Sequence, residues 1–240
     1  MPVWYARHRT KGGDTTMSRI AFIGGTGHEG MGLALRCALA GEEVVIGSRN
    51  RARAQAAAQK EIDRLKALRP DAHIEGRDNL HAVDGAEIVC ICVPYSGFET
   101  TLHELAHKMA GKILLDVVNP LTVKHGVFKL EPVAAGSVGE FAQELVPDAH
   151  VVSAFKNLSA EELLHLNHPL AGDVVLCGEH EESKQRIIDL VHRMPNLRPV
   201  DAGSIINSRR LESITALLLN INKRYRANAS IQILGLRGDV

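Results

Sequence analysis

The stretch from Arg19 to Arg53 decides the fold, and it reads RIAFIGGTGHEGMGLALRCALAGEEVVIGSRNRAR. An apolar run over 20–23 predicts a strand, which leads directly into the glycine motif GTGHEG of residues 25–30. A helical pattern over 33–41 and a second apolar strand over 44–46 follow. Glycines at this spacing let the backbone approach a pyrophosphate, which binds the free N–H groups at the start of the helix. This order of elements predicts a dinucleotide site in a Rossmann-type fold.

The residues after the second strand indicate which dinucleotide binds. An NAD site places Asp or Glu there for the ribose 2′-hydroxyl, whereas an NADP site needs cations and hydroxyls for a 2′-phosphate. This chain has Ser48 and Arg49, with Arg51 and Arg53 close behind and no acid. A solvated basic start to a helix is the alternative, but cations there conflict with the helix dipole, and a bound dianion removes that conflict. The sequence therefore predicts NADP, with Arg49 forking onto the phosphate and Arg53 adding a second charge.

Length and composition narrow the class of protein. The 240 residues suffice for one large domain, or for one domain with a smaller partner. Basic and acidic residues balance at 28 each, so nothing points to nucleic acid or to an anionic membrane surface. No apolar run reaches the roughly 18 residues of a transmembrane helix. Residues 1–16 lack the apolar core of a signal peptide, so we expect a disordered extension before Met17.

The four cysteines are expected in buried helix or strand, which favours small core residues of a cytoplasmic protein over a disulfide framework. They are Cys37, Cys90, Cys92 and Cys177.

Beyond residue 53 the chain continues to alternate helices and strands. The run 87–93 is apolar, as a central parallel strand requires, and ends at Pro94, where ligands bind in doubly wound sheets. Residues 121–136 are less regular and predict a mobile loop over the site. We expect an α/β fold: a Rossmann-type doubly wound parallel sheet over 17–155 and a smaller C-terminal α/β domain over 156–240. Further helices are expected over 52–68, 79–83, 97–109, 138–145, 160–166, 181–194 and 207–224, and further strands over 72–75, 112–118, 150–155, 174–177 and 197–201.

The segment His103-Glu104-Leu105-Ala106-His107 matches the zinc-protease pattern HExxH letter for letter. The pattern is expected on a helix that flanks the sheet, and no third ligand follows because residues 108–111 end that helix. We therefore interpret these histidines as solvated residues of an exposed face and predict no metal site.

Other polar residues near the expected site carry weaker signals. The side chains of His28 and Glu29 are expected to point outward and to do no chemistry. Lys156 and Asn157 follow a strand that ends near the site, so substrate contact and simple solvation both stay open for them. No serine lies in a nucleophile elbow and no carboxylate pair is placed for acid–base work, which suits hydride transfer between two cofactors that the protein mainly aligns.

From Met17 nearly to its C-terminus, the chain resembles the F420-dependent NADP oxidoreductases, NADPH-dependent reductases of the deazaflavin coenzyme F420. The most specific pieces are the glycine loop, VIGSR at 45–49, VVSA at 151–154, LRPVDAG at 197–203, and NSR at 207–209 with ES at 212–213.

The resemblance implies reversible hydride transfer between NADP(H) and coenzyme F420, without an obligatory acid or base side chain. It also implies a cytoplasmic homodimer, which fits the apolar stripe of the long C-terminal helix. Residues 156–240 would then serve deazaflavin binding and dimerisation. The implied cofactor-binding residues are Gly25, Thr26, Gly27, His28, Glu29 and Gly30 in the loop, Ser48, Arg49 and Arg53 at the 2′-phosphate, Val93, Pro94 and Ala160 on the nicotinamide side, and Leu158 and Leu234 around the deazaflavin.

One departure bears on the acceptor. After VVSA the family often carries a His-Thr pair, whereas this chain reads FKNL over 155–158. A flavin, a ferric chelate or a small carbonyl compound is the alternative acceptor, since a related reductase module feeds flavin and iron in membrane ferric reductases. An NADPH-sensing interaction protein is the non-enzyme alternative.

Overall fold

One large sheet organises the molecule. The computed structural model describes residues 17–236, so the extension expected at 1–16 lies outside the described residues. Eight strands pair in the order β10-β9-β8-β5-β4-β1-β2-β3, all parallel except for the β8–β9 pair. These strands are β1 (Arg19–Ile23), β2 (Glu43–Ser48), β3 (His73–Asp78), β4 (Ile88–Ile91), β5 (Ile113–Asp116), β8 (His150–Ser153), β9 (Gly172–Gly178) and β10 (Leu197–Asp201).

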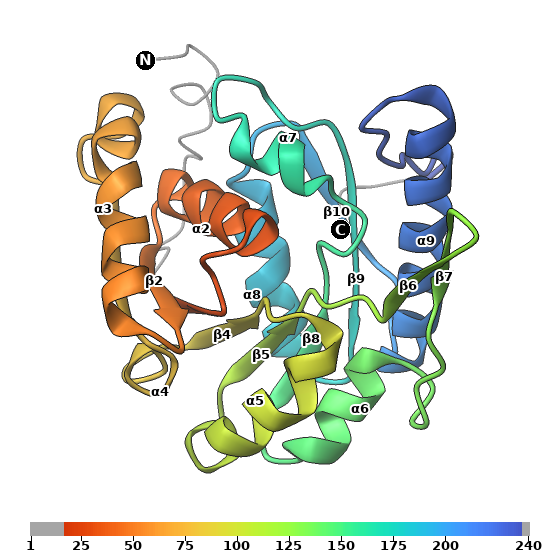
Figure 1. The fold of residues 1–240 in the computed structure, drawn as a ribbon, viewed down its shortest axis with the longest axis horizontal. Helices are drawn as coiled ribbons and strands as arrows, with labels where there is room; N and C mark the ends of the chain where they lie inside the picture. The colour runs from red at the N-terminus through yellow and green to blue at the C-terminus, as the bar shows by residue number, and fades with distance from the viewer. Residues whose placement is uncertain (1–16, 237–240) are drawn as a thin grey trace.

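Helices cover both faces of this sheet (Figure 1). Helices α2, α3, α7 and α8 pack on one face against Ile20 and Phe22, whereas α4, α5, α6 and α9 pack on the other against Ala21 and Ile23. The alternation along β1 follows from the two-residue period of a strand. This two-sided core confirms the predicted α/β Rossmann-type fold. The helices are α2 (His28–Ala40), α3 (Arg51–Leu68), α4 (Asn79–Ala82), α5 (Phe98–Leu105), α6 (Val138–Leu145), α7 (Ala160–Leu164), α8 (Glu181–His192) and α9 (Ser208–Tyr225), with 3-10 turns at Tyr95–Gly97, Ala106–Lys108 and Ile205–Asn207.

Local signals place the first elements where the sequence predicts them. Helix α2 ends at Gly41, whose φ of 100° only glycine adopts without strain. Helix α3 begins after Asn50, whose side chain accepts a hydrogen bond from the Arg53 N–H, as an N-cap residue does. These two signals fix the ends of the β1-α2-β2-α3 unit that carries the glycine loop.

The segment 121–136 is more regular than predicted. Strands β6 (Leu121–Lys124) and β7 (Val127–Leu130) form an antiparallel hairpin, joined by a turn in which both His125 and Gly126 have positive φ. Asn220 of α9 brackets this hairpin, because its side chain accepts from the Phe128 N–H and donates to the Phe128 carbonyl, both at 2.9 Å. The mobile-loop prediction is therefore wrong. A two-residue hairpin turn of this kind usually carries Asn or Asp before glycine. This chain has His125 at that position, so the usual sequence signal of a hairpin is missing.

The C-terminal segment continues the same sheet. Strands β9 and β10 add to β8, so the sheet runs through the boundary predicted at residue 155. Asn157 also ties the segment after β8 to the start of β9, since its amide donates to the Asp173 carbonyl at 2.8 Å. The assignment of NADP binding to 17–155, and of deazaflavin binding and dimerisation to 156–240, stays a prediction. Among the described residues, no helix combines the length and apolar character that crossing a membrane demands.

Candidate functional site

A cavity of about 950 Å³ opens where β1, β2, β4 and β5 end. In a doubly wound sheet ligands bind at this carboxyl edge. Its wall brings together many of the residues singled out from the sequence, whereas Gly25, Leu158, Ala160 and Leu234 are not among the lining residues. The predicted residues that line it are Thr26, Gly27, His28, Glu29, Gly30, Ser48, Arg49, Arg53, Val93 and Pro94.

The glycine loop holds the start of α2 against the ends of β1 and β4. A Cβ on Gly30 would lie 2.8 Å from the Gly25 Cα and 2.9 Å from the Cys92 Cβ, so only glycine fits there. Gly27 is exposed, lines the cavity and precedes α2, whose first turn has no side-chain cap. The N–H groups of this turn are therefore open toward the cavity, which is the arrangement that binds a pyrophosphate.

Cations gather at the β2 side of the cavity. Arg49 and Arg53 are exposed and line it, and neither guanidinium forms an ion pair with any residue in the range 17–236. Ser48 is buried beside them and accepts a hydrogen bond from the Asn50 N–H at 3.2 Å. Arg51 is exposed but is not a lining residue. Two unpaired guanidinium groups and a hydroxyl at the end of β2 match the needs of a ribose 2′-phosphate.

Asn79, which the sequence analysis did not identify, holds the glycine loop in place through its side chain. This residue lines the cavity at the start of α4, and its Oδ1 accepts a hydrogen bond from the Gly24 N–H at 3.3 Å. The sequence did offer one signal for Asn79, since it is a short polar residue directly after a strand. The apolar pattern of that strand, β3, was too weak to show that it ends at the site.

Replacing Asn79 with Ala is expected to lower the free energy of unfolding by about 1 kcal/mol, because one partly buried hydrogen bond is lost. The loop also loses a brace, so NADPH should bind more weakly. Urea unfolding and a fluorescence titration with NADPH measure the two effects. An unchanged NADPH affinity would show that the loop holds its shape without Asn79.

The opposite side of the cavity is less charged. Val93 and Pro94 line it after β4, together with Val118 and Asn119 after β5. Cys92 is half-buried and lies past the end of β4, which corrects the expectation that all four cysteines are buried within helix or strand. An apolar wall of this kind suits a nicotinamide ring.

The HExxH segment lies on α5 and the 3-10 turn that follows it. Glu104 lines the cavity, whereas the His103 side chain is exposed and lies 3.7 Å from Glu99. Within residues 17–236, no three His, Cys, Asp or Glu side chains are grouped as metal ligands would be.

Glu29 differs from its predicted role. Its side chain is half-buried at the cavity wall and not turned outward. Burial raises the pKa of this carboxyl from 4.5 to about 7, the Lys156 cation opposes that rise, and the Asp116 carboxylate adds to it. The expectation that the Glu29 side chain points outward is therefore wrong, while His28 is exposed as expected.

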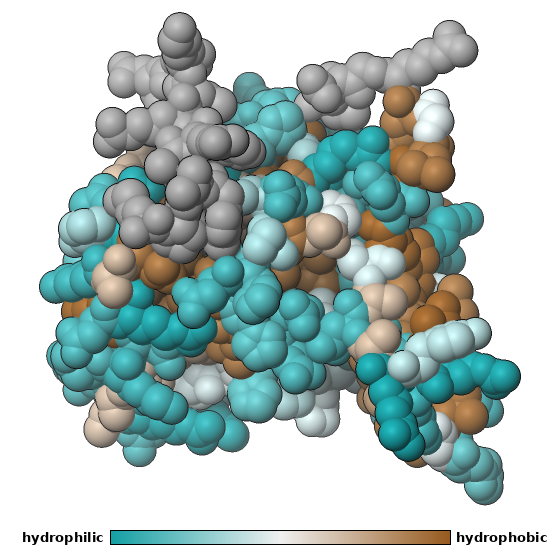
Figure 2. Space-filling model, turned by 90° about the horizontal axis from the view of Figure 1, so that it is seen from above, coloured by the Kyte–Doolittle hydropathy of each residue, from teal (hydrophilic) through white to brown (hydrophobic). Residues whose placement is uncertain are grey.

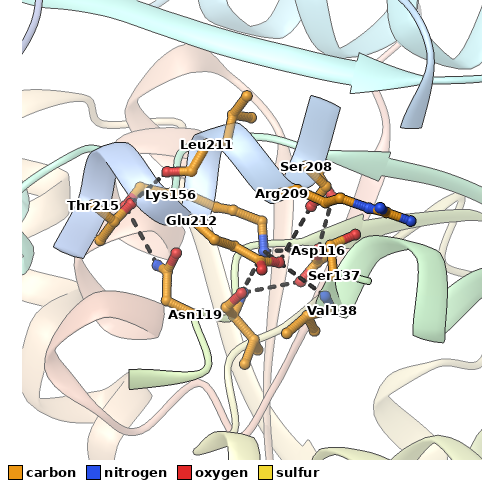
Figure 3. Close-up of polar contacts among 12 residues, drawn as sticks. Asp116, Asn119, Ser137, Val138, Lys156, Ser208, Arg209, Leu211, Glu212 and Thr215 are labelled. Atoms are coloured by element: carbon orange, nitrogen blue, oxygen red, sulfur yellow. Dashed lines mark hydrogen bonds and ion pairs between the residues drawn. The ribbon is translucent and has the colours of Figure 1, made fainter. Parts of the chain in front are cut away.

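Lys156 belongs to a buried charge cluster, which Figure 3 shows. Its Nζ lies 2.8 Å from Asp116 Oδ2 and 3.4 Å from Glu212 Oε1, and it donates a hydrogen bond to the Val118 carbonyl. The Lys156 and Asp116 side chains have no exposed surface, and Glu212 is only 2% exposed. The alternative that Lys156 is merely solvated is thus wrong. Its anionic partners are Asp116 of β5 and Glu212 of α9, which lie far from it in the sequence.

Hydroxyl groups complete the cluster. Ser153 donates to Asp116 Oδ2 at 2.7 Å and lies 3.0 Å from the Ser208 hydroxyl, which in turn donates to Glu212 Oε1 at 3.3 Å. Thr215 donates to the Lys156 carbonyl at 2.8 Å. Of the six residues of the cluster, all but Lys156 come from β5, β8 and α9, so the cluster joins the two halves of the sequence (Figure 3).

The cluster contains a pair of carboxyl groups, although neither lines the cavity where a pair for acid–base work would have to lie. Asp116 and Glu212 share one lysine, and burial raises the pKa of Glu212 although Lys156 lowers it. Neither carboxylate lines the cavity, but both hold its wall. The Val118 N–H donates to Asp116 Oδ1 at 3.0 Å, and the Asn119 amide donates to the Lys156 carbonyl at 3.4 Å.

The residues implied for the deazaflavin lie beside this wall. Leu158 is half-buried against the core, Ala160 opens α7, and Leu234 is 83% exposed in the segment after α9. The Ile233 N–H donates to Asp173 Oδ2 at 2.6 Å, so this segment lies at the start of β9, which Asn157 also contacts. Leu158 and Leu234 therefore share one neighbourhood at the carboxyl edge of β8.

Comparison with known proteins agrees with this geometry. A family model described as "NADP oxidoreductase coenzyme F420-dependent" matches residues 19–120. The F420-dependent NADP reductase of Methanothermobacter marburgensis is 36% identical over 223 residues, which are 91% of this chain and 99% of that protein. The rat metalloreductase STEAP3 is 31% identical over 81% of this chain but only 36% of its own length. A crystal structure from Arthrobacter sp. FB24, assigned to the F420-dependent NADP reductases, superposes with a TM-score of 0.73 at 24% identity and covers 92% of this chain and 100% of that one.

Proposed function

Because the chain belongs to the family of F420-dependent NADP oxidoreductases, we propose that it transfers hydride reversibly between NADP(H) and coenzyme F420. The observation that carries the proposal is the pair of unpaired arginines, Arg49 and Arg53, at the β2 end of a glycine-loop cavity. This end of the cavity would hold the 2′-phosphate of NADP. The pyrophosphate would then lie on the first turn of α2, and the nicotinamide would reach Val93 and Pro94.

The deazaflavin would bind beside that ring. Leu158 and Leu234 would bracket it, and Ala160 would lie on the nicotinamide side, at the edge where β8 ends. In such a site the protein holds the two reacting carbons about 3–3.5 Å apart and excludes water, and the cofactors supply the hydride chemistry. No side chain is needed as an obligatory acid or base for the hydride itself.

An exposed apolar surface supports a homodimer. Leu217 of α9 is 59% exposed, and Tyr225, Leu234 and Leu236 are exposed nearby in the sequence. Figure 2 shows hydrophobic side chains on the side of the molecule that carries α9 and the C-terminal segment. A second copy of this chain would cover them. We place the homodimer in the cytoplasm, in keeping with cysteines that form no disulfide in the described chain.

The test of the proposed function is a spectrophotometric assay. Purified protein should bleach oxidised coenzyme F420 with NADPH far faster than with NADH, because only NADPH carries the phosphate that the arginines bind. Protein without NADPH is the control. Clear NADPH binding without any bleaching would reject F420 as the acceptor and leave the NADPH site intact.

The similarity to a metalloreductase and the FKNL segment favour one other acceptor class, a flavin or a ferric chelate. Oxidation of NADPH by these acceptors, measured beside coenzyme F420 at equal concentration, separates the two. Faster turnover with a flavin or ferric chelate would replace F420 in the proposal.

A further inference from the structure

Glu29 is a carboxyl group without a protein partner at the wall of the cavity. It lies in the first turn of α2 and is half-buried. Across the described part of the chain, its carboxyl accepts no hydrogen bond and joins no ion pair. Buried or half-buried carboxyl groups normally have such partners. A carboxyl that lines a cofactor cavity without one is available to a ligand.

Glu29 lies beside the end of β4, because a Cβ on the adjacent Gly30 would lie 2.9 Å from the Cys92 Cβ, and Val93 and Pro94 follow Cys92 on the side of the cavity proposed for the nicotinamide. Its charge acts on Asp116 of β5, on Lys156 after β8 and on Cys90 of β4. In the sheet order, β4, β5 and β8 lie on one side of β1, whereas β2 and its phosphate-binding arginines lie on the other. Glu29 and Arg49 therefore line different parts of the cavity.

The surrounding charges leave this carboxyl poised between its two forms. Burial disfavours ionisation of Glu29, Lys156 favours it and Asp116 disfavours it, with the outcome that its pKa is raised to about 7. Near neutral pH the group is therefore about half protonated. A charge placed beside it by a ligand would move that balance strongly.

We propose that the Glu29 carboxyl holds the proton that accompanies hydride transfer, ionised beside the cationic ring of NADP⁺ and protonated beside the neutral ring of NADPH. The proposal rests on the NADP site of the proposed function. When hydride leaves NADPH for an acceptor, the ring becomes cationic and the Glu29 O–H bond breaks, and the proton goes to the reduced acceptor or to water. In the reverse direction Glu29 takes up a proton as NADPH forms. Water can replace the carboxyl in this role, so the hydride step itself does not require it.

The test measures protons on binding, without an acceptor. Calorimetric titrations at pH 7 in two buffers of different ionisation enthalpy give the protons released when NADP⁺ or NADPH binds. Because the carboxyl is about half protonated before binding, NADP⁺ should release about half a proton and NADPH should take up about half a proton, a difference of about one proton. The 2′-phosphate, with a pKa near 6, contributes equally to both titrations and cancels in the difference.

A neutral isostere identifies the group. In Glu29→Gln the difference in protons released should vanish. The ratio of the Kd values for NADP⁺ and NADPH should also lose its pH dependence, which in the unaltered protein amounts to about tenfold for each unit by which the pKa of Glu29 differs between the two complexes. Glu104→Gln, at another lining carboxyl, is the matched control and should keep both. A proton difference that persists in Glu29→Gln, or disappears in Glu104→Gln, would overturn the proposal.

The outcomes separate this proposal from the proposed function. Failure to bleach coenzyme F420 leaves the proton measurement untouched, because no acceptor is present. Absence of NADP⁺ and NADPH binding would reject both. Tight binding of both coenzymes with equal proton release would reject the role of Glu29 alone.

Discussion

Replacement of Lys156 with Met is expected to lower the free energy of unfolding by about 3–5 kcal/mol, because it leaves two buried carboxylates without their cation. Asp116 and Glu212 have almost no exposed surface, so water cannot take the place of the ammonium group. Their remaining partners are two serine hydroxyls and two backbone N–H groups. Urea unfolding of the two proteins measures the difference.

The loss should depend on pH with a definite sign. Burial already raises the pKa of Glu212 in the folded state, and the loss of Lys156 raises it further above the unfolded value. A carboxyl with a raised folded pKa contributes its stability at low pH and loses it as the pH rises through that pKa. The deficit of Lys156→Met should therefore be larger at pH 8 than at pH 5.

A surface lysine provides the control for this experiment. Lys108 forms an ion pair with Asp84, and both side chains are partly exposed. Lys108→Met should cost less than about 1 kcal/mol, as exposed ion pairs do. A deficit for Lys156→Met that is equally small, or independent of pH, would contradict the buried cluster as a stabilising unit.

Replacement of Arg49 with Asp is expected to reverse the preference between NADPH and NADH. Removal of one charge-assisted contact to the 2′-phosphate costs about 1.5–3 kcal/mol, which corresponds to about a 10- to 150-fold loss of NADPH affinity. The new carboxylate repels the phosphate and can accept the 2′-hydroxyl of NADH instead. Fluorescence titrations with the two coenzymes measure both Kd values.

Arg51 offers a matched control, since it is an exposed arginine of the same segment that does not line the cavity. Arg51→Asp makes the same change of charge and should alter the NADPH affinity much less. If Arg49→Asp binds NADPH as tightly as the unaltered protein does, the 2′-phosphate does not bind at the end of β2.

The elements that the sequence predicted well are those whose signals are local. The glycine loop, the caps at Gly41 and Asn50, and the apolar central strands depend on neighbours within a few residues. Helix α6 and strand β10 have the predicted bounds for the same reason. The position of Arg49 and Arg53 at the cavity could also be predicted, because the loop after β2 leads directly to it.

What the sequence could not show depends on pairs of distant residues. Lys156 and Glu212 are 56 positions apart, and only the packing of α9 against β5 and β8 brings them together. The inward direction of Glu29 follows from the packing of the first turn of α2 against the residues that follow β4, which no periodicity encodes. The hairpin of β6 and β7 likewise depends on Asn220 in α9.

The position of α9 has a consequence for how the protein forms during biosynthesis. Units near the N-terminus generally fold first as a chain leaves the ribosome. The end of the cavity that carries Arg49 and Arg53 needs β1, α2, β2, the start of α3 and Asn79 of α4, so the N-terminal third of the chain can build it. The wall after β5, proposed for the nicotinamide, is tied to Lys156 and through it to Glu212, which emerges much later. A partly synthesised chain can therefore form the end of the cavity proposed for the 2′-phosphate. The wall proposed for the nicotinamide, where the chemistry would occur, forms only when almost the whole polypeptide has been made.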